Sequence, residues 1–124
     1  MPRRHREEDR SAEAFLPLSS AEFHILLAIA DGERHGYGIM QEVRASTNGT
    51  IRLGPGTLYR CIQDLLRNGL IEESGRSPAP DEDQRRRYYR LSQIGRHVLS
   101  AETRRLADVL ALAQAKRVLR RVPI

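Results

Sequence analysis

Three polar side chains share one face of the helix that the sequence predicts over residues 55 to 68. Arg60, Gln63 and Arg67 are three or four positions apart, which places them on one side of a helix. The opposite side carries an apolar stripe formed by Leu58, Ile62, Leu65 and Leu66. Arginine and glutamine can each make two hydrogen bonds to a base edge, and arginine also binds phosphate. The polar face therefore has the chemistry to bind nucleic acid.

The start of the same helix is suited to an anion. Gly54 and Pro55 open the helix, because proline is tolerated at the first helical position, where its missing N–H has no intrahelical partner. Gly56 would let a phosphate come close to the unpaired backbone N–H groups of the first turn. Tyr59 lies on the shoulder of the polar face, where both a packed ring and an exposed hydroxyl fit the spacing.

Arginine supplies the positive charge of the chain, and it is unevenly distributed. Lys116 is the single lysine among 21 basic residues, and the net charge is +5. The region from 85 to 105 is strongly positive, because Glu102 is its one acidic residue. Its first three residues are Arg85, Arg86 and Arg87. An arginine triplet taken alone indicates a solvated surface, but next to a basic helix face it favours contacts to phosphate.

The remaining pattern predicts the elements that position these side chains. Ser19 and Glu22 form a capping box, and Ser92 has the form of a second helix cap. The predicted elements, in chain order, are helices over 20–30 and 35–46, a very short strand over 51–53, a helix over 55–68, a hairpin of strands over 70–73 and 87–91, and a helix over 93–121.

This order predicts a mainly α fold, a winged helix-turn-helix of three helices and a two-stranded wing with a long C-terminal dimerisation helix. In this fold the third helix faces the major groove and the wing lies over the neighbouring backbone. The expected organisation is a disordered tail over 1–17, a DNA-binding domain over 18–91 and the dimerisation helix over 92–124.

The last predicted helix is apolar over too wide a surface for a helix that packs on one side. Between Leu106 and Ala113 every residue except Asp108 is apolar. We therefore expect the helix to pack against its own domain and against a second copy of the chain, which predicts a homodimer. The candidate dimerisation residues are Leu99, Leu106, Val109, Leu110 and Ala113. No aromatic residue follows Tyr89, so this helix has no ring on which an effector could stack.

Four sequence blocks resemble the PadR family of bacterial transcriptional regulators. The blocks are His35–Ile39, Gly56–Arg60, Asn68–Ile71 and Arg87–Ser92 with Gly95, and the similarity extends over about residues 18 to 120. The resemblance implies a dimeric winged-helix repressor, released from its DNA operator by a small molecule or another signal. Because two copies related by a two-fold axis read two half-sites, we expect this operator to be a pseudo-palindrome. The resemblance also implies that Thr57 and Tyr59 lie near phosphate and that Arg60 and Gln63 lie near bases.

Two positions depart from the pattern of this family. Pro55 stands where the family often has a small polar residue, which removes one phosphate contact. Asp81, Glu82 and Asp83 make the tip of the predicted wing acidic, so we expect the tip to point away from DNA. The expected DNA-binding residues are therefore those of the third helix and the base of the wing, namely Gly56, Thr57, Tyr59, Arg60, Gln63, Arg67, Arg85, Arg86 and Arg87.

Enzymatic and metal-dependent functions find little support. The sequence has no nucleophile paired with a base, no phosphate-binding glycine loop and no clustered metal ligands, so we expect no enzyme activity, cofactor or metal. Cys61 is interpreted as a buried filler, with a redox role left open. Tyr37, Tyr88 and Tyr89 are interpreted as packing residues. The absence of a long apolar run predicts no membrane contact and a cytoplasmic, nucleoid-associated protein.

Three functional hypotheses follow from these features. The first is a sequence-specific, dimeric transcriptional regulator that binds double-stranded DNA. The second is a winged-helix module that binds protein, which a polar face poor in arginine would have favoured. The third is a nonspecific nucleic-acid-binding protein.

Overall fold

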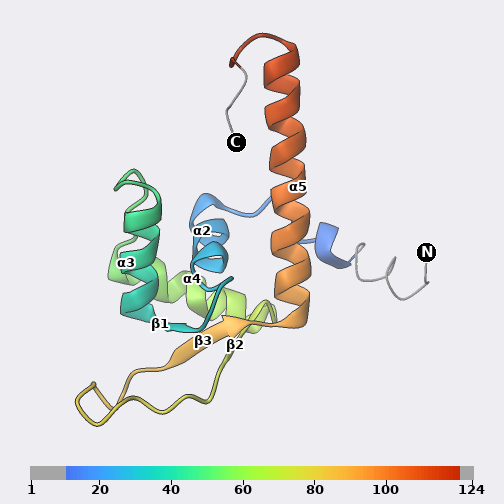
Figure 1. The fold of residues 1–124 in the computed structure, drawn as a ribbon. Coiled ribbons are helices and arrows are strands. Elements are labelled where there is room, and N and C mark those ends of the chain that lie inside the picture. The colour runs from blue at the N-terminus through green and yellow to red at the C-terminus, as the bar shows by residue number, and fades with distance from the viewer. Residues whose placement is uncertain (1–10, 121–124) are drawn as a thin grey trace.

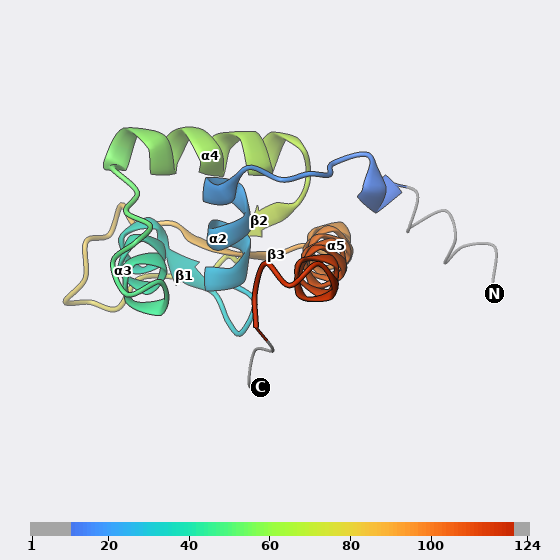
Figure 2. The same ribbon diagram turned by 90° about the horizontal axis from the view of Figure 1, so that it is seen from above.

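The computed structural model describes residues 11–120. Its elements, in chain order, are α2 (Ser20–Ala28), β1 (Arg34–His35), α3 (Gly36–Ser46), α4 (Pro55–Arg67), β2 (Ile71–Glu73), β3 (Tyr88–Leu91) and α5 (Gln93–Ala115). Helix α2 lies between α3 and α5 and also contacts α4, and the small sheet closes one end of this group (Figures 1 and 2). Helix α5 runs on well beyond the other helices (Figure 1).

Local signals in the sequence set the starts of these helices. Ser19 Oγ accepts a hydrogen bond from the Glu22 amide at 3.1 Å, which is the N-cap bond of the predicted capping box. The Glu22 carboxylate accepts from the Ser19 hydroxyl at 2.9 Å, in place of the Ser19 backbone N–H that a full capping box uses. Ser92 Oγ accepts from the Gly95 amide at 3.0 Å and so caps α5. Pro55 is the first residue of α4. The N-terminal boundaries predicted for these three helices are confirmed.

The sheet has three strands in the order β1-β3-β2, all antiparallel. The predicted hairpin is confirmed, with Ile71 opposite Leu91. The third strand was not predicted: Arg34 and His35 pair with Tyr89 and Tyr88. The wing is therefore joined through its inner strand to the start of α3.

The predicted strand over 51–53 is wrong, because these residues form an irregular loop. Ile51 and Leu53 are half-buried and pack against the core from that loop. The Thr47 hydroxyl fixes the loop instead of a strand partner, because its oxygen accepts from the Ile51 amide at 3.1 Å. The alternation of apolar residues here reflects loop packing.

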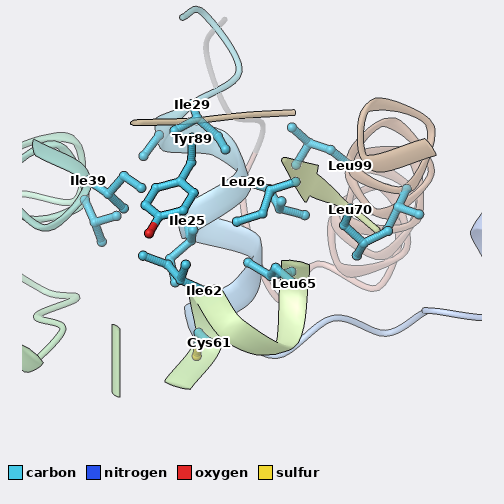
Figure 3. Packing of buried hydrophobic residues seen from close by; sticks show 14 of the residues in the cluster. Ile25, Leu26, Ile29, Ile39, Cys61, Ile62, Leu65, Leu70, Tyr89 and Leu99 are labelled. Atoms are coloured by element: carbon cyan, nitrogen blue, oxygen red, sulfur yellow. The ribbon is translucent and has the colours of Figure 1, made fainter. Parts of the chain in front are cut away.

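Side chains of α2 lie at the centre of the core, and residues of α3, α4, β3 and α5 pack around them (Figure 3). Ile25 and Leu26 of α2 have no exposed surface, and neither has Ile39 of α3 or Leu65 of α4. Burying each such side chain stabilises the fold by about 1.5–3 kcal/mol. Tyr89 of β3 points into the same cluster (Figure 3). The sheet, the helices α2, α3 and α4, and the first half of α5 thus share one core.

The ordered part of the N-terminal segment includes residues 11–17, whereas the sequence predicts order only from residue 18. Residues 11–17, expected to be disordered, begin with a helical turn, and Ala12 is 1% exposed. Phe15 and Leu16 are half-buried against the core, which explains why this part of the chain is held. The rest of the predicted tail, 1–10, lies outside the described residues.

Helix α5 departs from its prediction in two ways. It ends at Ala115 and not near residue 121, because Arg117 adopts a left-handed conformation (φ 59°) and the Val118 amide bonds back to the Ala113 carbonyl at 2.9 Å. Its second half also does not pack on its own domain, since the residues from 103 to 112 are all exposed. The domain covers only the first half of the helix.

Candidate nucleic-acid interface

Helix α4 presents the polar face that the sequence predicts. Arg60, Gln63 and Arg67 are exposed, whereas Leu58 and Ile62 on the other side are at most 1% exposed. Arg67 Nη1 lies 3.2 Å from the Asp64 carboxylate. Such an exposed ion pair contributes about 0–1 kcal/mol, so a phosphate can compete for the guanidinium.

The first turn of α4 is open to an incoming group. Gly54 is its N-cap and provides no side-chain hydrogen bond to the first N–H groups. Apart from Gly56 itself, its two neighbours and the backbone of the same helix, no atom of the described residues lies within 4 Å of the position that a Cβ on Gly56 would take. Thr57 is half-buried beside it. Uncapped N–H groups at a helix start attract anions, so this turn can accept a phosphate.

Tyr59 connects α4 to the start of α3. A Cβ added to Gly36 would lie 3.1 Å from the Tyr59 hydroxyl oxygen, so the ring rests on the α3 backbone. The side chain of Tyr59 remains 52% exposed. The sequence allows both a packed and an exposed Tyr59, and the structure shows both features, because the ring contacts α3 on one side and is accessible on the other.

The three wing arginines lie beside acidic groups. Arg85 makes two hydrogen bonds to the Asp83 carboxylate, each of 3.2 Å, and Arg87 Nε lies 3.8 Å from Glu73. The Arg85 hydrogen bond lowers the pKa of the Asp83 carboxyl. The acidic tip that was expected to point away thus places Asp83 against an arginine. Arg85 and Arg87 nevertheless stay exposed and can exchange these partners for phosphates.

Arg86 differs from its two neighbours because it turns toward the domain. Its Nη1 lies 3.1 Å from His35 Nε2, and its side chain is only 36% exposed. Tyr88 packs edge-on against the His35 ring, with 5.3 Å between the ring centroids, and its hydroxyl donates to the Glu82 carboxylate. Arg76 covers the other part of the Tyr88 ring, 4.5 Å from its centroid. These contacts hold the wing against the start of α3.

A cavity of about 220 Å³ lies where α3, α4 and the wing meet. Its walls include the side chains of His35, Tyr37, Tyr59 and the wing arginines. Burial and the nearby Arg86 guanidinium lower the pKa of His35. The site thus combines a helix face, a wing and a basic cavity between them.

Sequence reasoning missed four residues near this surface. His35 was named only within a sequence block, and its role as the N-cap of α3 needs the fold to be seen. Tyr37 was interpreted as a packing residue, which is wrong because it is 52% exposed. Arg44 and Arg52 line a groove of about 670 Å³ between α3 and the loop that follows. Their signal was weak, since isolated arginines are common on surfaces.

The other interpreted residues are placed as follows. Tyr88 and Tyr89 are buried, as expected for packing residues. Cys61 is buried, which raises its pKa and agrees with a filler. Leu99 is 7% exposed in the core of its own domain, so its place among the dimerisation residues is wrong. Ala113 is half-buried, and the other three candidates are exposed: Leu106, Val109 and Leu110.

Over residues 11–120, His, Cys, Asp and Glu side chains form no group of three that could hold a metal ion. In the same part of the chain, no helix combines the length and apolarity needed to cross a membrane.

A basic, exposed third helix with a wing beside its first turn defines a winged helix-turn-helix DNA-binding protein. The model of the transcriptional regulator PadR-like family matches residues 25–101. The chain belongs to this family, and it is a DNA-binding transcriptional regulator.

Individual relatives agree with this assignment. Transcriptional regulator Rv3488 of Mycobacterium tuberculosis is 34% identical over 91 residues, which span 73% of this chain and 79% of that protein. A Streptococcus transcriptional regulator of known structure is 29% identical, with a TM-score of 0.64 over 77% of this chain and 90% of the other. A PadR family regulator from Clostridium difficile shares the fold, with a TM-score of 0.65 at 17% identity over 78% of this chain and 97% of the other.

Proposed function

We propose that the chain is a sequence-specific repressor that binds a pseudo-palindromic operator as a homodimer. The observation that carries this proposal is the presence, in one chain, of a basic α4 face and an unpartnered apolar surface on α5. One winged helix reads only a half-site, and a second copy doubles the contacts, which converts weak binding into specific binding.

The site residues divide into base readers and phosphate contacts. Arg60 and Gln63 point away from the core at the middle of α4, so they are the best placed to reach base edges in the major groove. The open first turn at Gly56, with Thr57 and Tyr59, suits a backbone phosphate. The remaining expected phosphate contacts are those of the end of α4 and the wing: Arg67, Arg85, Arg86 and Arg87.

The apolar surface of α5 supports the dimer. Leu106 and Leu110 are each 38% exposed and Val109 is 50% exposed, although these side chains are large and apolar. Contiguous exposed apolar surface of this kind marks a protein contact. A second α5 is the simplest partner, because the same surface then covers itself around a two-fold axis.

The proposal includes release of the repressor from its operator by a small molecule or another signal. It also locates the protein at the nucleoid, where the operator DNA lies. No aromatic residue follows Tyr89, so an effector that binds along α5 would be held by aliphatic and polar contacts. The exposed leucines of this helix offer such aliphatic contacts.

A competition gel tests the proposal. Labelled DNA from upstream of the gene is challenged with unlabelled specific or random duplex, at low and at moderate salt. We expect the specific duplex to compete much better, and both affinities to fall steeply with salt because arginine–phosphate contacts release counterions. Equal competition would support a nonspecific nucleic-acid-binding protein, and the absence of any shifted band would support a protein-binding module.

A further inference from the structure

Two groups that both donate hydrogen bonds face each other in the cavity between α3 and the wing. His35 Nδ1 accepts from the Gly38 amide at 3.0 Å, so this nitrogen carries no proton. A neutral imidazole then carries its proton on Nε2. Arg86 Nη1 lies 3.1 Å from Nε2, and a guanidinium has only donors. The two N–H groups therefore repel unless they share an acceptor.

The other tautomer does not remove the conflict. A proton on Nδ1 would point at the Gly38 N–H and would remove the side-chain cap that stabilises the start of α3. The nearest carboxylate does not remove it either. Glu82 lies 4.0 Å from Arg86 Nη1, which is too long for a hydrogen bond, and it accepts from the Tyr88 hydroxyl. Within residues 11–120, no shared acceptor lies at hydrogen-bond distance from the pair.

The surroundings favour an anion as that acceptor. The cavity, of about 220 Å³, is also lined by Arg85, Arg87 and Tyr59, and by the Asp83 carboxylate, whose two oxygens already accept from Arg85. A phosphate oxygen has several lone pairs and a negative charge, so one oxygen can accept from both an imidazole and a guanidinium. The charge of His35 itself is not needed, because burial and Arg86 lower the pKa of its ring.

We propose that this cavity binds one phosphate group, with His35 Nε2–H and Arg86 Nη1–H as its two convergent donors. The inference rests on the proposed function, since a DNA backbone phosphate is the source that the position between α4 and the wing favours. A free phosphate ion has the same chemistry, and the test separates the two sources.

The DNA arm is a double-mutant cycle. His35→Asn keeps a side-chain oxygen that can cap α3 but removes the donor that faces the cavity. Arg86→Met removes the second donor and keeps a side chain of similar length, whereas glutamine would retain an amide N–H₂. Each change should weaken binding of the specific duplex about tenfold, because each removes one hydrogen bond to a charged group. The affinity of the double variant for the specific duplex should be about that of the single variant that binds more weakly, because both donors bind the same phosphate.

A matched control accounts for the lost charge. Arg104 is exposed on α5 and donates to Ser100 Oγ at 3.2 Å, away from the cavity. Arg104→Met removes the same charge as Arg86→Met and should change the affinity for DNA less than twofold. Thermal unfolding of each variant shows whether the fold is kept.

The phosphate arm uses the unaltered protein and needs no variant to fold. The ¹⁵N shifts of the His35 ring report which nitrogen carries the proton, and we expect Nε2. Inorganic phosphate, titrated against chloride at constant ionic strength, should shift the Nε2 signal more than that of His24.

The two arms separate the outcomes. Coupled losses in the cycle support a DNA backbone phosphate in the cavity. A phosphate-dependent shift of Nε2 without any loss of DNA binding in the variants supports the cavity as a site for a free phosphate ion. Full DNA binding by both variants, with no phosphate-dependent shift, would overturn the site while leaving the proposed function intact. Failure of the unaltered protein to bind its duplex would instead refute the proposed function.

Discussion

Replacement of Gly95 by alanine should destabilise the protein, although alanine is the better helix former. A Cβ on Gly95 would lie 1.8 Å from the Leu70 carbonyl oxygen and 2.8 Å from its carbonyl carbon. These are backbone atoms, and the same carbonyl accepts from the Ser92 amide at 3.1 Å, so it cannot rotate away freely. Helix α5 would have to move by more than an ångström, together with the wing strands beneath it.

The size of the effect follows from two opposing contributions. Alanine gains at most about 1 kcal/mol over glycine at this position, because Gly95 lies in the first turn of α5 and not in its interior. Overpacking typically costs about 1–3 kcal/mol and occasionally more, and a clash with backbone belongs at the upper end. We therefore expect the free energy of unfolding of Gly95→Ala to fall by about 2 kcal/mol, which lowers the melting temperature by about 10 °C.

Urea unfolding followed by circular dichroism measures this change. The matched control is Gly56→Ala, because no atom lies within 4 Å of a Cβ at Gly56. That variant should be as stable as the unaltered protein or more stable by up to about 1 kcal/mol. A Gly95→Ala protein with an unchanged or higher urea midpoint would refute the close approach of α5 to Leu70.

Three further predictions concern pH, DNA reading and assembly. A hydrogen bond from Arg105, together with one from the Leu18 amide at 2.7 Å, lowers the pKa of the Glu102 carboxyl despite its burial. The ionised Glu102 therefore stabilises the fold above pH 4.5, and this stabilisation is lost as pH falls through the lowered pKa. Glu102→Gln should therefore flatten the acid limb of a stability–pH curve, and an unchanged limb would contradict this. Gln63→Ala should reduce discrimination at one base position by about 1–3 kcal/mol, whereas Arg87→Ala should weaken binding to all duplexes about equally. Affinities for operators with single-base changes measure both effects. The reverse pattern would assign base reading to the wing. Leu110→Asp should give monomers or aggregates in sedimentation, because an unpaired carboxylate is costly in an apolar contact, and an unaltered protein that sediments as a monomer yet binds a palindrome tightly would refute the dimer.

Local and periodic signals in the sequence were enough to predict the main helices and the polar face of α4. The Ser19 and Ser92 caps act within three residues of themselves, so the sequence alone reveals them. The α4 face follows from helical spacing, because Leu58 and Ile62 must lie on one side when Gln63 lies on the other.

Features that depend on distant contacts were not predictable. Strand β1 has only two residues, which is too short for a periodic pattern, and His35 meets its partner Tyr88 from far along the chain. The order of residues 11–17 depends on Ala12 finding a buried position in the core, which so short a segment does not reveal in its sequence. Arg117 ends the helical turns after α5 by adopting a conformation that usually indicates glycine.

The unequal support along α5 has a mechanical consequence. The helix is anchored to its domain at Gly95 and again at Glu102, whose carboxylate also receives the Leu18 amide just before α2 begins. Beyond Glu102 it extends for thirteen residues to Ala115, or about 20 Å, with little support from its own domain. In a dimer built through this free segment, α5 acts as a lever whose fulcrum is inside the DNA-binding domain. A small tilt of one helix against the other would be magnified into a larger displacement between the two α4 faces, so the angle at which two copies cross would set which half-site spacing they can bridge.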